Sequence, residues 1–196
     1  MNCYYLPTEI EIDGKTHPIS KKGDFRMVMD CFALLNDKEI PEKYRPYFCL
    51  FIFYEDVNNK EDVKNLGDLD EAVKKMNDFF NCNQPDFGVK VHHNLIDWEK
   101  DSQLICAAVN MVAQTEVRSE PYLHWFTFCG YLSSTPQETT WSVVVSLRHK
   151  KATGKKLEKH EREFIRDNPQ WFMTESDIEA EQDFNEWMEA NGIIRK

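Results

Sequence analysis

Hydrophobic residues recur at helical spacing along most of this chain. The first stripe follows Asp24 and consists of Phe25, Val28, Met29, Phe32 and Leu35. Intervals of three and four residues place side chains on one face of a helix, and an aspartate directly before such a stripe is a favoured N-cap. The pattern therefore predicts a helix that begins next to Asp24.

Further helices are predicted along the rest of the chain. They are expected after Pro46, over 68–80, over 98–114, from Pro121, from Pro136, over about 156–167 and from Thr174 to about Gly192. Asp68, Asp97 and Thr135 are the expected N-caps. The stretch YFCLFIFY after Pro46 is apolar on every side, which favours a buried helix, although a core strand would show the same composition. Residues 58–67 and 81–94 are polar or irregular and are expected to be loops.

The segment EIEIDGKTHPI, residues 9–19, follows a different pattern. Apolar and charged residues alternate in EIEI, and Asp13-Gly14 follows directly. Alternation around an Asp-Gly pair is the short-range signal of a β-hairpin. A hairpin of this size is not stable alone, so we expect it to pack on the helices.

These elements predict a mainly α fold, a compact helical domain of about six to eight helices with a small N-terminal β-hairpin. The few Gly and Pro residues, 7 and 8, suit long helices better than many short strands. We expect one helical domain over 1–168 that includes the hairpin at 9–19. An acidic C-terminal helix is expected within 169–196, packed on that domain or forming an appendage.

The six cysteines are spread along the chain without any CxxC pair. Zinc sites and small disulfide frameworks cluster their cysteines, so we expect buried free thiols and a reducing cytosol. The N-terminal residues lack the pattern of a signal peptide. No apolar run reaches the ~20 residues that a membrane span requires, and we expect no membrane association.

Net charge, −10, argues against a nucleic-acid partner, because neutralisation of phosphates dominates that affinity. The charge is unevenly distributed. Residues 148–166 contain eight Lys or Arg and three Asp or Glu, whereas 174–190 contain seven acids and no Lys or Arg. The basic block could meet an acidic partner or the acidic segment of the same chain, or it could be a solvated surface.

Signals for catalysis or metal binding are weak. His92-His93 lies near Asp97 and Glu99, but adjacent histidines cannot easily face one ion and no spaced third ligand follows. The segment ATGKK lacks the first glycine of a phosphate loop and the hydroxyl residue after its lysine. We therefore expect no enzyme activity, no cofactor and no metal. An enzyme that uses His124 or the His92-His93 loop is the alternative, which bound metal would support.

The stretch EPYLHWFTFCGYLS, residues 120–133, is the richest in aromatic residues. On a helix that starts near Pro121 it would be apolar nearly all round, which is typical of a buried helix. We expect a central core helix here, with His124 or Tyr131 at its edge.

Several segments together resemble a known family. They are GKTHPISKKGDFRMVMDCFALLND (14–37), FFN (79–81), LIDWEKDSQLICAAVNMV (95–112), PYLHWFTFCGYLSS (121–134) and VVVSLRHKK (143–151). Over about residues 10–165 the chain resembles the phage "gene product fifteen" family of tailed phages and prophages of Gram-positive bacteria. The resemblance implies a tail assembly chaperone that binds the tape-measure protein and helps recruit tail-tube subunits.

The resemblance also implies location and partners. The expected partners are the tape-measure protein and the major tail protein, with weak self-association, in the cytoplasm of the bacterial host and not in the mature virion. Candidate partner-binding residues are Phe51, Phe53, Arg148, Lys150, Lys151, Phe184, Trp187 and Met188. The alternatives are a structural tail or joining protein of the virion and a protein-interaction adaptor of prophage origin.

Overall fold

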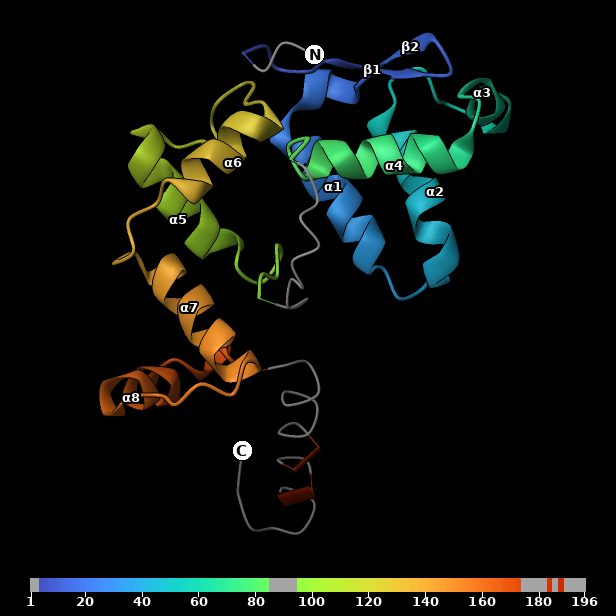
Figure 1. Ribbon diagram of the computed structural model, residues 1–196. Coiled ribbons are helices and arrows are strands. Elements are labelled where there is room, and N and C mark those ends of the chain that lie inside the picture. Colours follow the sequence, from blue (N-terminus) through green and yellow to red (C-terminus); the bar gives the residue numbers. More distant parts are fainter. Residues whose placement is uncertain (1–3, 85–94, 174–182, 185–186, 189–196) are drawn as a thin grey trace. The chain divides into compact units, whose positions relative to one another are not determined.

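The computed structural model describes residues 4–84, 95–173, 183–184 and 187–188 (Figure 1). Within these residues the chain forms eight α-helices and one two-stranded antiparallel sheet. The elements are β1 (Glu9–Ile12), β2 (Lys15–Pro18), α1 (Phe25–Asn36), α2 (Arg45–Phe53), α3 (Lys60–Asn65), α4 (Leu69–Phe80), α5 (Ser102–Ala113), α6 (Trp125–Ser133), α7 (Thr140–Ala152) and α8 (Lys159–Asp167). The predicted fold class, mainly α with a small N-terminal hairpin, is confirmed.

The chain divides into two compact units. The first comprises residues 1–91 and 97–139, and the second comprises 92–96 and 140–196. The hairpin and α1 to α6 belong to the first unit, and α7 and α8 belong to the second. The acidic helix expected within 169–196 stays a prediction, because most of that segment lies outside the described residues.

The hairpin closes at the predicted Asp13-Gly14 turn. Both residues have positive φ, 50° and 75°, as a two-residue hairpin turn of the primed type requires. Ile10 and Ile12 point to the buried side. The carboxylate of Asp13 accepts a hydrogen bond from the backbone N–H of Asp68 over 3.2 Å, just before α4. The hairpin therefore packs on the helical part of the first unit, as its small size requires.

Aromatic side chains form the core of the first unit, where α1 packs against α2 and α6, and α2 packs against α4. The ring of Phe53 on α2 lies 5.3 Å from that of Phe79 and 5.6 Å from that of Phe80, measured between centroids. Phe32 on α1 lies 5.8 Å from Trp125 on α6. These edge-to-face pairs each add about 0.5–1.5 kcal/mol beyond burial of area.

The aromatic stretch 120–133 begins its helix later than predicted. α6 starts at Trp125, not near Pro121, because the residues before it pair with the start of α1. The N–H of Phe25 donates to the carbonyl of Leu123 over 2.9 Å, which holds Leu123 in an extended segment. The expectation of a helix buried all round is also wrong, since Trp125 and Phe128 are its only buried residues.

Three other boundaries differ from the prediction. Asp97 accepts from the N–H groups of Glu99 and Lys100 and closes a separate turn, so α5 begins at Ser102. A turn after Pro136 delays α7 to Thr140. The expected loop over 58–67 contains α3, which Asn59 and Asp62 stabilise as a reciprocal capping box.

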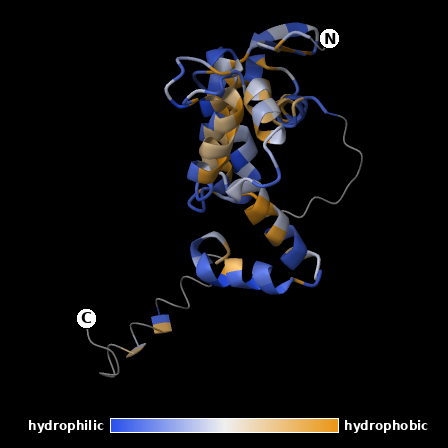
Figure 2. Ribbon diagram, turned by 90° about the vertical axis from the view of Figure 1, so that its left-hand side faces the viewer, coloured by the Kyte–Doolittle hydropathy of each residue, from blue (hydrophilic) through white to orange (hydrophobic). Residues whose placement is uncertain are grey.

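The described part of the second unit joins α7 to α8 and a 3-10 turn over Pro169–Trp171. Phe164 on α8 stacks on Trp171 with 6.0 Å between ring centroids. Lys150 on α7 pairs with Glu161 on α8, and this contact lowers the pKa of the Glu161 carboxyl. Figure 2 shows that α8 is largely hydrophilic, which fits the basic block predicted here.

Candidate partner-docking surface

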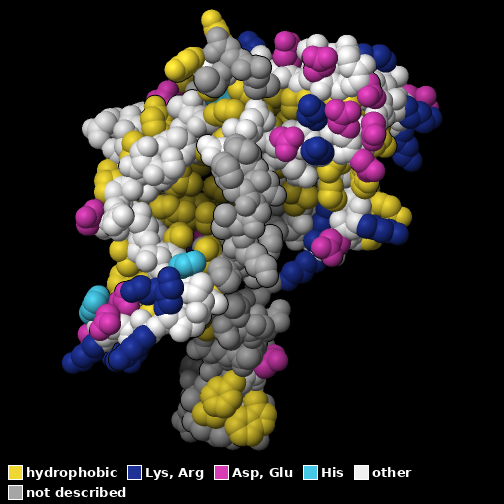
Figure 3. All heavy atoms as spheres, viewed as in Figure 1, with side chains coloured by type: hydrophobic (Ala, Val, Ile, Leu, Met, Phe, Trp, Pro, Cys, Tyr) yellow, Lys and Arg dark blue, Asp and Glu magenta, His cyan; other side chains and the backbone are white. Residues whose placement is uncertain are grey.

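The outer face of α2 exposes a row of aromatic side chains. Tyr44, in the 3-10 turn before the helix, is 48% exposed, and Tyr47, Phe48 and Phe51 are 38, 48 and 37% exposed. Their spacing of three, four and seven residues from Tyr44 places them on one side of the helix. We call these four residues the α2 aromatic face. In Figure 3 hydrophobic side chains gather over α2, beside the charged side chains over α4.

The inner face of α2 fixes how the aromatic face is presented. Cys49, Leu50 and Phe53 have no exposed surface, and they pack between α1 and α4. The guanidinium of Arg45 donates to the carbonyls of Ile40 and Leu35 over 2.8 and 3.2 Å. These bonds attach the first turn of α2 to the end of α1 and to the loop that follows it, and so fix the start of the helix that carries the exposed rings.

Polar contacts border the α2 aromatic face. The hydroxyl of Tyr47 donates to the carboxylate of Asp70 over 2.8 Å, and this contact raises the pKa of Tyr47. The ammonium of Lys43 lies 4.7 Å from the ring centroid of Tyr44. Phe48 and Phe51 bear no polar atoms of their own. The face thus has an apolar part, Phe48 and Phe51, and a polar edge toward α4.

The structure separates the predicted partner-binding residues into different environments. Phe51 is part of the α2 aromatic face. Phe53 has 0% exposed surface, so its side chain has no surface to offer a partner, and the expectation that both phenylalanines contact a partner does not fit this geometry. The reason is the helical period, since residues two apart point to different sides of a helix.

The basic residues of α7 are already engaged within the second unit. The guanidinium of Arg148 donates to the carbonyl of Trp171 over 2.7 and 3.0 Å and to that of Leu95 over 3.0 Å. Lys150 pairs with Glu161, whereas Lys151 is exposed. Two of the three basic candidates therefore hold the unit together. Partner binding by Lys151 stays a prediction.

The aromatic residues of the acidic segment form an exposed pair. Phe184 and Trp187 are 57 and 56% exposed, and their ring centroids lie 6.4 Å apart. Met188 is half-buried. The remainder of 174–196 lies outside the described residues, so these three positions stay candidates from the sequence.

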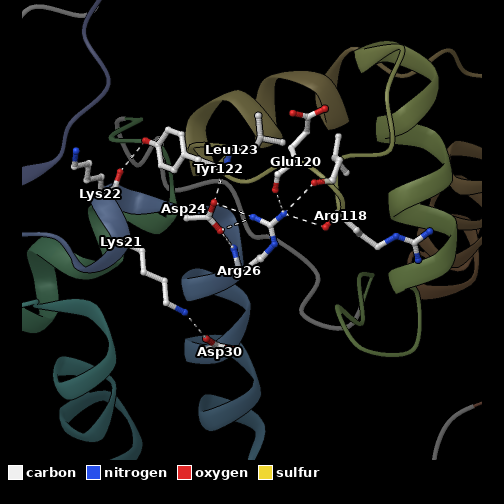
Figure 4. A network of polar contacts seen from close by, with 10 residues as sticks. Lys21, Lys22, Asp24, Arg26, Asp30, Arg118, Glu120, Tyr122 and Leu123 are labelled. Carbon is white, nitrogen blue, oxygen red and sulfur yellow. Dashed lines mark hydrogen bonds and ion pairs between the residues drawn. The ribbon is translucent and has the colours of Figure 1, made fainter.

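A polar network at the start of α1 is the other distinctive site (Figure 4). Arg26 donates to both carboxylate oxygens of Asp24, over 3.1 and 2.9 Å, and to the carbonyls of Val117, Arg118 and Glu120. The same carboxylate accepts from the N–H of Leu123 over 2.9 Å. A surface pocket of about 560 Å³ lies beside this network.

The polar groups of this network form hydrogen bonds to one another and to the backbone, and these bonds stabilise the fold. Asp24 is 4% exposed. Nη1 of Arg26 donates to both of its carboxylate oxygens, while Nη2 binds the backbone carbonyls, and together these bonds fix both side chains. Nearby, Nδ1 of His124 accepts from the N–H of Phe126, and Nε2–H donates to the carbonyl of Pro7, each over 3.0 Å. His124 is therefore the N-cap of α6, with no ring nitrogen left for a substrate.

No metal site or membrane span is found where the structure is described. Within the described ranges, no three His, Cys, Asp or Glu side chains are grouped so that they could hold an ion. The His92-His93 pair lies outside those ranges. No helix among the described residues is both long and apolar enough to cross a bilayer.

The sequence contained a signal for the α2 aromatic face that the prediction missed. Tyr44, Tyr47 and Phe48 share helical spacing with Phe51. The opposite side of the helix is equally apolar, with Cys49, Leu50 and Phe53. Hydrophobicity alone could not show which side faces solvent, and of the four residues of the α2 aromatic face only Phe51 is among the predicted partner-binding residues.

The chain matches the model of a known protein family. A family model described as "Bacteriophage Gp15 protein" matches residues 4–170 of the 196-residue chain. No curated protein and no solved structure matches significantly. The matched range includes the α2 aromatic face and ends just after α8.

Proposed function

The chain belongs to the bacteriophage Gp15 protein family, and we propose that it is a tail assembly chaperone that binds the tape-measure protein through the α2 aromatic face. The chaperone role comes from the resemblance described above. The observation that carries the site is four aromatic side chains left exposed on one side of a helix whose other side is buried. Exposed apolar patches of a few hundred Å² often mark interaction sites.

The size of the face favours a helical segment as its occupant. At roughly 200 Å² for each aromatic side chain, exposed fractions of 37–48% give on the order of 350 Å². A stable dimer needs about 800 Å² from each partner. A second copy of this chain would therefore bind only weakly through this face, whereas a short amphipathic helix can cover it.

The side chains of the α2 aromatic face indicate which residues a partner helix would need. Helix-in-groove recognition uses apolar anchors at i, i+3, i+4 and i+7, which would lie across Phe48 and Phe51. Asp70, whose carboxylate accepts from Tyr47, borders the face on the α4 side. The occupant we propose is an amphipathic helix of the tape-measure protein with a basic residue toward α4.

The remainder of the proposal concerns assembly. The chaperone acts in the cytoplasm of the bacterial host, keeps the tape-measure protein dispersed, and brings it to the major tail protein. Weak self-association along one long tape-measure helix would let several copies bind side by side.

Co-expression with a tape-measure fragment tests the site. The wild-type chain should raise the soluble fraction of the fragment and co-purify with it. Phe48→Ser removes a central apolar anchor, and loss of such an anchor weakens an interface by about 1–2 kcal/mol or more. We therefore expect at least a roughly fivefold weaker affinity of this variant, measured by titration of the purified proteins.

Met111→Ser is the matched control. Met111 is 53% exposed on α5, away from the α2 aromatic face, so this variant should bind as the wild type does. Equal weakening by both substitutions would refute the site. No effect of the wild-type chain on the solubility of the fragment, together with no co-purification, would refute the chaperone function itself.

A further inference from the structure

Four cations of the second unit have no counter-charge among the described residues. They lie on the last turn of α7, in the segment that follows it and on α8. All four are exposed, and no described residue forms an ion pair or a side-chain hydrogen bond with them. Figure 3 shows Lys and Arg side chains gathered over α8 and the chain that leads into it. The four residues, which we call the basic surface, are Lys151, Lys155, Lys156 and Arg162.

The neighbouring Lys and Arg side chains, by contrast, are already bound within the unit. Arg148 donates to two backbone carbonyls. Glu158 is the one acid of 148–166 outside the ion pairs of this region, so the basic surface keeps an excess of positive charge. The ion pairs are Lys150 with Glu161, Lys159 with Glu163 and Arg166 with Asp167.

Local contacts bring the basic surface to one corner of the unit. The N–H of Lys155 donates to the carbonyl of Lys150 over 2.9 Å and so closes the end of α7. Lys150 also pairs with Glu161, which joins the last turn of α7 to the first turn of α8. Lys151 and Arg162 each follow one member of this pair by one residue. The four cations are therefore neighbours, although they come from different elements.

The acidic segment of the same chain begins beside this corner. Residues 174–190 contain seven Asp or Glu and no Lys or Arg. The chain is held just before them, because Arg148 donates to the carbonyl of Trp171 over 2.7 and 3.0 Å. Arg148 precedes Lys151 by about one helical turn. At about 3.3–3.6 Å for each extended residue, the segment that starts at Glu175 is long enough to reach the basic surface.

This short connection favours the acids of the same chain over those of a second copy. Three residues separate Trp171 from Glu175. A short link gives two binding groups an effective concentration of about a millimolar or more, which free copies of the chain at micromolar concentration do not reach. Single exposed ion pairs contribute little, so the contact needs several charges at once and should weaken with added salt.

We propose that the acidic segment, residues 174–190, binds the basic surface of its own chain and covers it. Another anionic molecule, such as an acidic region of a protein, then reaches the four cations only by displacing this segment. The contact involves the second unit alone, whereas the α2 aromatic face belongs to the first unit. The inference is therefore independent of tape-measure binding.

Carbodiimide cross-linking of the full-length chain tests the contact, because the reagent joins Lys amines directly to Asp and Glu carboxyls. An equal mixture of unlabelled and nitrogen-15-labelled chain is cross-linked at low salt and mapped by mass spectrometry. Lys151, Lys155 or Lys156 should be joined to acids of 174–190, with both peptides carrying the same label. The yield should fall steeply in about 1 M salt, where the screening length is about 3 Å.

Three results of the cross-linking would overturn the proposal. The first is a product that joins the segment equally well to Lys60, an exposed lysine of α3 in the first unit. The second is a set of products in which light and heavy peptides are mixed at random, since this would assign the contact to a second copy. The third is the absence of any cross-link between 174–190 and the basic surface.

Neutral variants give a second, independent measurement. One variant removes four charges from the acidic segment, and a control variant removes the same number from exposed acids of the first unit, so that both have the same net charge. The segment variant carries Glu175→Gln, Asp177→Asn, Glu179→Gln and Glu181→Gln. The control variant carries Glu9→Gln, Glu11→Gln, Glu39→Gln and Glu138→Gln.

Fluorescein-labelled polyglutamate is the probe, and fluorescence anisotropy follows its binding to each protein. The segment variant should bind the probe at least about threefold more tightly than the control variant, because a competitor held at millimolar effective concentration has been weakened. Equal affinities of the two variants would refute the cover. Replacement of the basic surface by glutamine in the segment variant should abolish the gain, and a gain that persists would place the probe elsewhere.

Discussion

His124 has the environment of a neutral histidine. Its side chain is 1% exposed and caps α6 through Nδ1, which has to be unprotonated to accept the N–H of Phe126. Burial lowers its pKa below the ordinary value of 6.5, although the carbonyl of Pro7 and the charge of Asp24 act in the opposite direction. The residue that first suggested catalysis thus serves as a structural cap.

A pH-dependent stability follows from this cap. Because the pKa is lower in the folded state, the unfolded state binds the proton more readily, and stability is lost as pH falls below about 6.5. His124→Asn keeps a capping side chain that does not titrate. We expect the wild type to lose more free energy of unfolding than this variant between pH 7.5 and 5.5, measured by urea denaturation.

Other titrating groups are shared by the two proteins and cancel in this comparison. Equal losses in the wild type and in His124→Asn would show that His124 does not titrate as its burial indicates.

At the scale of single residues, the sequence predicted roles that depend on neighbours in the chain. Asp24 was expected to cap α1, and it accepts from the N–H of Arg26 over 3.0 Å. The carboxylate of Asp24 also accepts a hydrogen bond from the N–H of Leu123, which lies 99 positions away in the sequence. No local pattern can reveal a partner at such a distance, and for the same reason the start of α6 was placed too early.

At the scale of elements, α2 shows how two apolar faces of one helix can have different environments. Phe53 on the inner face contacts Tyr54, Phe79 and Phe80. Phe51, two positions earlier, is 37% exposed. The two residues are chemically identical, so only their environment separates them, and that makes them a matched pair for experiment.

Alanine at these two positions should give opposite outcomes. Phe53→Ala leaves a cavity in the aromatic core and should lower the free energy of unfolding by about 3–5 kcal/mol. Phe51→Ala removes a partly exposed ring and should change it by less than about 1 kcal/mol, while weakening tape-measure binding. Urea denaturation and titration with the tape-measure fragment measure the two effects. Similar destabilisation by both variants would contradict the assignment of the faces.

Element type was easier to predict than element ends. The helices at α1 and α4 and the hairpin carry a strong period together with a cap or a turn signal, and they form as expected. α3 was missed because its six residues, KEDVKN, show no apolar stripe. Its signal was the spacing of Asn59 and Asp62, which is a capping box without the usual hydroxyl and glutamate.

At the scale of the whole molecule, the mainly α fold and the family follow from the sequence, whereas the proposed docking site does not. Local patterns in the sequence predict which segments form helices. Which face of a helix is exposed to solvent depends on which faces pack together after folding. The α2 aromatic face is defined by the folded structure, in which α1 and α4 cover the opposite side of α2.

Analysis of purified virions separates the proposed chaperone from a structural tail protein. A chaperone is released when the tail is complete, so mass spectrometry of mature particles should detect the major tail protein and not this chain. Detection of this chain at a fixed ratio to the major tail protein would favour a structural component instead. Infected-cell lysate, where the chain should be abundant, is the control for its detection.

The polar network around Asp24 and Arg26 has a consequence for synthesis on the ribosome. It joins the start of α1 to residues 117–123, and His124 reaches back to Pro7 over 117 positions. At about 5–20 residues per second, roughly 5–20 s pass between translation of the two halves of this junction. During that interval the nascent hairpin and first helices cannot complete their contacts, and their aromatic side chains remain open to the chaperones of the host.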